Sequence, residues 1–107
     1  MPITRDFRAT VWTRAQKDAR YRSAMLTEAI NELLTGDLGA GKAMLRDYVN
    51  ATLTFEGLAK ATGKPSKSLQ RMLGARGNPT AESLFGVIKV LQEVEHVQLQ
   101  VKVARVA

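Results

Sequence analysis

Apolar residues recur three or four positions apart along almost the whole chain, interrupted only by short glycine- and proline-containing breaks at 36–41, 63–65 and 74–79. This spacing places apolar side chains on one face of a helix. The chain has 107 residues, of which 45% are apolar, so one domain can bury a core without cross-links. We therefore expect a single all-α domain over residues 1–107.

Six helices are expected between the breaks. They cover 4–16, 18–36, 40–50, 54–63, a short segment that begins at Pro65 or Ser66, and 80–95. Thr4, Asp18, Thr54 and Thr80 each carry an oxygen that can cap the first turn of a helix. In the first helix, Phe7, Val11 and Trp12 form an apolar stripe, which is more typical of a core contact than of a dimer surface.

The last residues follow a different period. Val97, Leu99, Val101 and Val103 alternate with more polar positions, which predicts a β-strand within 96–107. A single strand leaves its backbone groups unpaired, so this strand needs a partner. The partner is either the N-terminal arm or the same strand of a second subunit, and we favour a homodimer.

The composition excludes several classes of site. The chain has no cysteine and one histidine, His96, which rules out disulfides, cysteine-ligated zinc and a multi-histidine metal site. We expect His96 to lie on the surface at a helix end, and we expect no catalytic residues, cofactor or metal. No uncharged apolar run is long enough for a signal peptide or a membrane span, so we expect a cytoplasmic protein without a membrane partner.

Residues 36–42 match the G-x4-G-K part of a phosphate-binding loop. The next residue is Ala43, which has no hydroxyl group for magnesium, and the segment follows a helix rather than a buried strand. We therefore expect these residues to connect two helices rather than to bind a nucleotide.

Positive charge is concentrated in one segment. The chain has 16 Lys and Arg against 10 Asp and Glu, a net charge of +6, which favours a polyanionic partner such as nucleic acid. No acidic residue lies between Gly57 and Thr80, where the basic residues are Lys60, Lys64, Lys67, Arg71 and Arg76.

The same segment has the spacing of a helix-turn-helix. Counting Phe55 as the first position of a 20-residue unit, the apolar positions 4, 15 and 18 are Leu58, Leu69 and Met72, and position 9 is Gly63. Glycine provides the positive φ of a sharp turn after a helix. In such a unit the second helix is presented to the DNA major groove.

The polar face of the second helix has a composition suited to DNA. When Leu69, Met72 and Leu73 point inward, Lys67 and Arg71 point outward, flanked by Ser68 and Gln70. Arg and Lys bind guanine, Gln binds adenine, and Ser binds either base or a phosphate.

The sequence LAKATGKPSKSLQRML at 58–73, followed by GNPT at 77–80 and a leucine-containing helix to 91, resembles the lambda-repressor-like (Xre-type) domain. Within it, the chain is most similar to the HigA-like addiction-module antidotes. The resemblance implies a prokaryotic, dimeric, sequence-specific DNA-binding repressor of the antitoxin type. Its organisation would be an N-terminal helical extension over 1–37, a helix-turn-helix core over 38–95 and a C-terminal strand over 96–107.

By match to the motif, some residues would read or clamp DNA and others would hold phosphate. Those that would read or clamp DNA are Ser66, Lys67, Gln70 and Arg71, and those that would hold phosphate are Thr54, Asn78 and Thr80. The polar face and the positive charge add Lys60, Lys64, Ser68 and Arg76 to the expected set. Two departures affect it: Lys64 replaces a usually apolar residue, and Pro65 replaces the usual Ser or Thr cap, so Ser66 is an alternative cap.

The alternative function is that of a protein-interaction antidote. It would mainly neutralise a toxin partner through residues 1–37, which the helix-turn-helix does not need, and DNA binding would be secondary.

Overall fold

The computed structural model describes residues 5–107, with side chains from Phe7 onward. The part described forms six helices: α1 (Arg5–Lys17), α2 (Ala19–Leu34), α3 (Leu38–Ala51), α4 (Thr54–Thr62), α5 (Ser66–Met72) and α6 (Ala81–Glu95). The prediction of an all-α fold with about six helices is confirmed. None of the helices in this part of the chain is long and apolar enough to cross a membrane.

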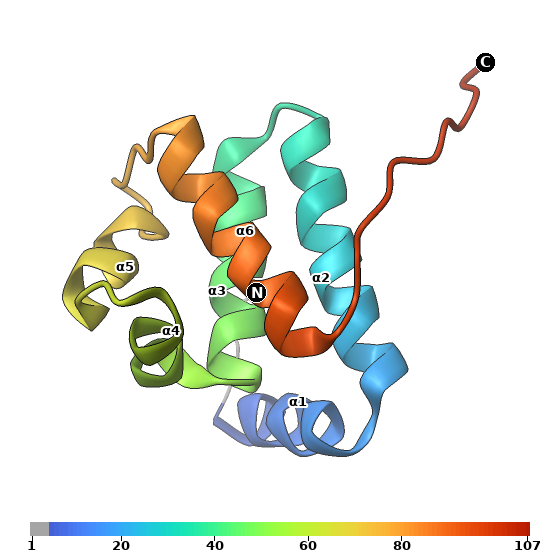
Figure 1. Cartoon of the computed structure of the whole chain (residues 1–107). Coiled ribbons are helices and arrows are strands. Elements are labelled where there is room, and N and C mark those ends of the chain that lie inside the picture. The colour runs from blue at the N-terminus through green and yellow to red at the C-terminus, as the bar shows by residue number, and fades with distance from the viewer. Residues whose placement is uncertain (1–4) are drawn as a thin grey trace.

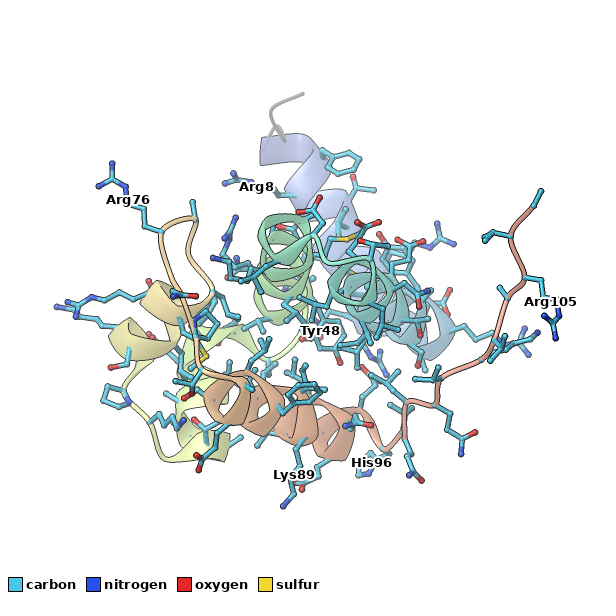
Figure 2. The ribbon with its side chains drawn as sticks, turned by 90° about the horizontal axis from the view of Figure 1, so that it is seen from above. Arg8, Tyr48, Arg76, Lys89, His96 and Arg105 are labelled. Carbon is cyan, nitrogen blue, oxygen red and sulfur yellow. The ribbon has the colours of Figure 1, made fainter. Side chains whose placement is uncertain are left out.

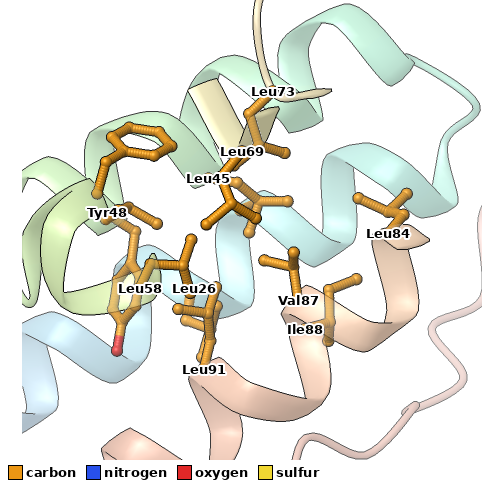
Figure 3. Packing of buried hydrophobic residues seen from close by; sticks show 13 residues of the cluster. Leu26, Leu45, Tyr48, Leu58, Leu69, Leu73, Leu84, Val87, Ile88 and Leu91 are labelled. Atoms are coloured by element: carbon orange, nitrogen blue, oxygen red, sulfur yellow. The ribbon is translucent and has the colours of Figure 1, made fainter. Parts of the chain in front are cut away.

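Helices α2 and α3 form the most extensive helix pair and run antiparallel (Figure 1). Helix α1 lies across one end of this pair, α4 and α5 lie beside α3, and α6 crosses in front. One hydrophobic core joins all helices except α1 (Figure 3). Its buried members are Leu26, Ala29, Leu45, Tyr48, Val49, Phe55, Leu58, Leu69, Leu73, Leu84, Val87, Ile88 and Leu91.

Several helix boundaries follow from local sequence signals. The Asp18 carboxylate accepts from the backbone N–H groups of Arg20 and Tyr21, and the Thr80 hydroxyl accepts from that of Ser83, so both predicted caps are confirmed. The third helix begins two residues before the predicted start at 40, because the Asp37 carboxylate caps it. The predicted cap Thr4 lies outside the described residues.

The predicted core position of the α1 stripe is largely wrong. Phe7 and Trp12 are 55% and 50% exposed, and from Phe7 to Lys17 only Ala15 is fully buried. Helix α1 packs across the ends of α2 and α3 rather than along them, so the turn with Ala15 reaches the interior while Phe7 and Trp12 border solvent.

The predicted C-terminal strand is not present in residues 5–107. The chain after α6 is an extended tail that leaves the body of the protein (Figure 1). Its first residues are held by α6: the Val97 N–H donates to the Gln92 backbone carbonyl, and the Leu99 N–H donates to the Gln92 side chain at 2.8 Å. A β-strand exists only through a backbone ladder, and residues 97–107 form none with the rest of the described chain.

A polar network joins the four helices α1, α2, α3 and α6. The Glu95 carboxylate of α6 accepts from Nε of Arg22 at 2.9 Å and from the Tyr48 hydroxyl at 2.6 Å. Arg22 also donates through Nη1 to the Ala15 carbonyl at 2.7 Å. Because the side chain of Glu95 is 5% exposed, this charge depends on its partners rather than on water.

Tyr48 is expected to lower the free energy of unfolding as the pH rises above 10. Burial, followed by the hydrogen bond to Glu95 and its negative charge, raises the pKa of Tyr48 well above its ordinary value of 10.0. Above pH 10 the unfolded chain loses this proton while the folded protein keeps it, so the unfolded state binds fewer protons and stability falls as pH rises. We expect Tyr48 to contribute a decrease approaching about 1.4 kcal/mol per pH unit in the free energy of unfolding.

The measurement is urea unfolding between pH 9 and 11 for Tyr48→Phe and for Tyr21→Phe, a matched tyrosine on α2. We expect a flatter pH dependence only in the first variant. The same slope in both variants would contradict this role of Tyr48.

Candidate nucleic-acid interface

The turn between α4 and α5 is tight because Gly63 adopts a left-handed conformation, with φ of 74°. Its N–H donates to the Ala59 carbonyl at 2.8 Å, and the Thr62 hydroxyl accepts from the Lys64 N–H. The predicted turn at Gly63 is therefore confirmed. Residues 63–65 are all that separate the two helices, which pack against each other.

Pro65 is the N-cap of α5, and Ser66 is its first helical residue. The predicted start at Pro65 or Ser66 is confirmed, and the helix begins at Ser66. Pro65 occupies the cap position without a side-chain bond, so the alternative in which Ser66 is the cap is wrong. Ser66 instead accepts from the Gln70 side-chain amide at 3.0 Å, so two of the predicted DNA-contacting side chains orient each other.

The two faces of α5 are divided as the helical spacing predicts. Leu69 and the following Leu73 are fully buried. The opposite face presents side chains that are all exposed: Lys67, Ser68, Gln70 and Arg71. This face is thus a row of hydrogen-bond donors and acceptors on a helix that the core holds from behind.

Thr54 begins α4 in an unusual conformation. Its φ of 66° is rare for a β-branched residue, and such outliers occur often at functional sites. Thr54 is exposed, and its hydroxyl accepts from the Gly57 N–H at 3.3 Å, which is the bond expected of a cap. Thr54 is nevertheless the first residue of the helix, and Leu53 occupies the cap position. Lys60 and Lys64, at the other end of α4, are also exposed.

The loop from α5 to α6 carries the remaining predicted residues. Arg76 and Asn78 are exposed, and Arg76 extends away from the body of the protein (Figure 2). The Thr80 hydroxyl accepts from the Ser83 N–H and donates to the Ser83 hydroxyl. Thr80 therefore has a structural role in capping α6, whereas Arg76 projects into solvent.

Helix α3 places two further polar residues, Arg46 and Asn50, beside α4 and α5. The sequence analysis did not identify them. Arg46 and Asn50 line a hollow together with the start of α4 and with Ser66 and Gln70 of α5. Glu56 also lines it, so this edge is less positive than α5 itself. No local signal could identify Arg46 or Asn50, because only the packing of α3 beside α4 and α5 places them there.

The glycine-rich segment that resembles a phosphate-binding loop serves the fold instead. Its last residues lie inside α3, where Gly41 packs so closely on Leu33 that a Cβ atom would collide with that side chain. The Lys42 ammonium group is buried and bonded to backbone carbonyls. The predicted helix–helix connection is confirmed for residues 36 and 37 only, because α3 already begins at Leu38, and the lysine of the pattern is buried.

No family model matches this chain, and no curated protein or solved structure matches it significantly. Its function is therefore argued from the residues and geometry of this surface.

Proposed function

We propose that this protein is a sequence-specific DNA-binding transcriptional regulator of the repressor type. The observation that carries the proposal is the exposed face of α5, where Lys67, Ser68, Gln70 and Arg71 stand over buried leucines. This face lies in a stretch of 22 residues, 58–79, that contains no acidic residue. An exposed helix with this composition fits the major groove in width and in hydrogen-bonding groups.

In the proposed complex α4, the Gly63 turn and α5 act as a helix-turn-helix. Arg71, Lys67 and Gln70 contact base edges from α5, and Ser66 and Ser68 contact bases or phosphates. Phosphates are held around this helix by Thr54, Lys60, Lys64, Arg76, Asn78 and Thr80. Because phosphate neutralisation supplies much of the affinity, binding weakens steeply with salt.

We propose further that two chains bind together. Val101 and Val103 are 78% and 82% exposed on the extended tail, and pairing with the tail of a second copy would supply the missing backbone ladder. A symmetric dimer reads two half-sites about 34 Å apart, so the operator would be a pseudo-palindrome.

The test is fluorescence anisotropy of the purified protein with a duplex from the region upstream of its own gene and with a scrambled duplex, at two salt concentrations. Tighter binding to the upstream duplex that persists at the higher salt supports the proposal. Equal, weak binding to both duplexes that is lost with salt would overturn it, because net charge alone explains such binding.

Arg71→Ala is expected to weaken binding to the specific duplex by about 1–3 kcal/mol if the arginine reads a base. The same anisotropy assay measures it, with Arg20→Ala as the control: Arg20 is an exposed arginine on α2, so the charge lost is the same. An equal loss on scrambled DNA would make Arg71 a phosphate contact, and no loss would remove it from the interface.

A second candidate function is supported by α1. Phe7 and Trp12 are half-exposed and border a hollow between α1, α2 and α3, which is the kind of surface that binds a protein partner. In this case the protein is an antidote that neutralises a toxin through residues 1–37. A small toxin-like reading frame next to the gene favours this function, and its product is then the partner to test.

A further inference from the structure

A buried lysine of α3 lies beneath the loop that joins α5 to α6. Lys42 is 3% exposed, and its Nζ donates to the carbonyl oxygens of Gly74 at 2.9 Å and Gly77 at 2.5 Å. One turn further along α3, Nη1 of Arg46 donates to the carbonyl oxygen of Leu73. Two cations of α3 thus hold three carbonyl groups at and beyond the end of α5.

The contacts of Lys42 and Arg46 satisfy both partners, the carbonyl groups and the cations. The last carbonyls of a helix have no partner within it, and positive charge near them is favourable. A buried ammonium group in turn needs acceptors, because it has lost its water. The loop is also tightly folded: the Gly77 N–H donates to the Gly74 carbonyl at 3.0 Å, and no Cβ would fit at Gly77 beside the carbonyl oxygens of Arg71 and Met72.

We infer that Lys42 and Arg46 are positioning residues of the DNA-contacting surface, an inference that rests on the proposed function. They set where the end of α5 and the loop backbone stand, and therefore where Arg71 and Arg76 reach the DNA. Lys42 is too buried to contact DNA itself, so its effect on binding passes through the backbone of residues 73–77.

The first test compares Lys42→Met with Lys89→Met. The first variant keeps most of the aliphatic side chain and removes the ammonium group. The second removes the same charge from α6, where Lys89 projects into solvent (Figure 2). Two quantities are measured: hydrogen exchange of the Gly77 amide by NMR, and the ratio of affinities for the upstream and scrambled duplexes by anisotropy.

In Lys42→Met we expect the Gly77 amide to exchange about tenfold faster, while core amides such as that of Leu45 keep their protection. We expect the ratio of affinities to fall by about tenfold relative to Lys89→Met, because the contacting groups lose their fixed placement. A ratio equal to that of Lys89→Met would overturn the inference, as would an unchanged exchange rate at Gly77.

Arg46→Met provides a second test in case Lys42→Met does not fold. Arg46 is half-buried and also lines the hollow beside α5, so the ratio is read together with hydrogen exchange. Its loss releases the Leu73 carbonyl, and we expect faster exchange of the Gly77 amide together with a smaller decrease in the ratio. An unchanged ratio in a folded Arg46→Met protein would overturn the role of Arg46. If the wild-type protein itself binds both duplexes alike, the proposed function fails; if it prefers the upstream duplex and the variants do too, only the positioning role fails.

Discussion

Replacing Glu95 by glutamine is expected to lower the free energy of unfolding by about 3 kcal/mol, because it leaves the Arg22 guanidinium group without its anion. Glutamine has nearly the shape of glutamate, so packing is preserved and the loss reports the charge. The Arg22 side chain is 26% exposed, which places the expected loss at the lower end of the range for a broken buried pair. The amide also accepts fewer hydrogen bonds than the carboxylate, which receives both Arg22 and Tyr48.

Chemical unfolding followed by circular dichroism at 222 nm measures this loss. The matched control is Glu93→Gln, an exposed glutamate two positions earlier on the same helix, for which we expect a change within about 0.5 kcal/mol. A similar, small change in both variants would show that the network linking α1, α2, α3 and α6 contributes little to stability.

The second large effect is expected for Leu69→Ala, which should cost about 2–5 kcal/mol. Helix α5 has only seven residues, and Leu69 is its one fully buried side chain. Leu69 and Leu73 lie together against α3 near Leu45 (Figure 3), so truncation leaves a cavity where α5 joins the core. The free energy of unfolding from urea titration is the quantity to measure.

Leu34→Ala is the control for this variant. Leu34 is 62% exposed at the end of α2, so the same truncation removes little buried surface, and we expect a change within about 0.5 kcal/mol. If Leu69→Ala is no more destabilising than Leu34→Ala, α5 is not anchored by this side chain, and the fixed placement of its exposed face would need another cause.

The helices could be predicted from the sequence because their signals are local. The apolar spacing, the caps at Asp18 and Thr80 and the left-handed turn at Gly63 each depend on residues within one or two turns. The inward and outward faces of α5 follow from the same spacing, so the candidate DNA-contacting residues could be named before their positions in space were known.

The features that could not be predicted all depend on distant residues. Whether 96–107 forms a strand depends on a second strand, and residues 5–107 contain none. The exposure of Phe7 and Trp12 depends on how α1 crosses α2 and α3, and an amphipathic pattern does not specify that crossing.

By itself, the sequence determined the helical class, the position of the turns and the polar face of α5, since 3.6-residue periodicity and capping are properties of neighbouring residues. Only the tertiary structure decided the roles of Lys42 and Arg46. Their partners lie 27 to 35 residues away, at the end of α5 and in the loop after it. In the sequence, Lys42 belongs to a pattern typical of phosphate-binding loops. In the folded protein it is buried and donates to backbone carbonyls of the loop that carries Arg76.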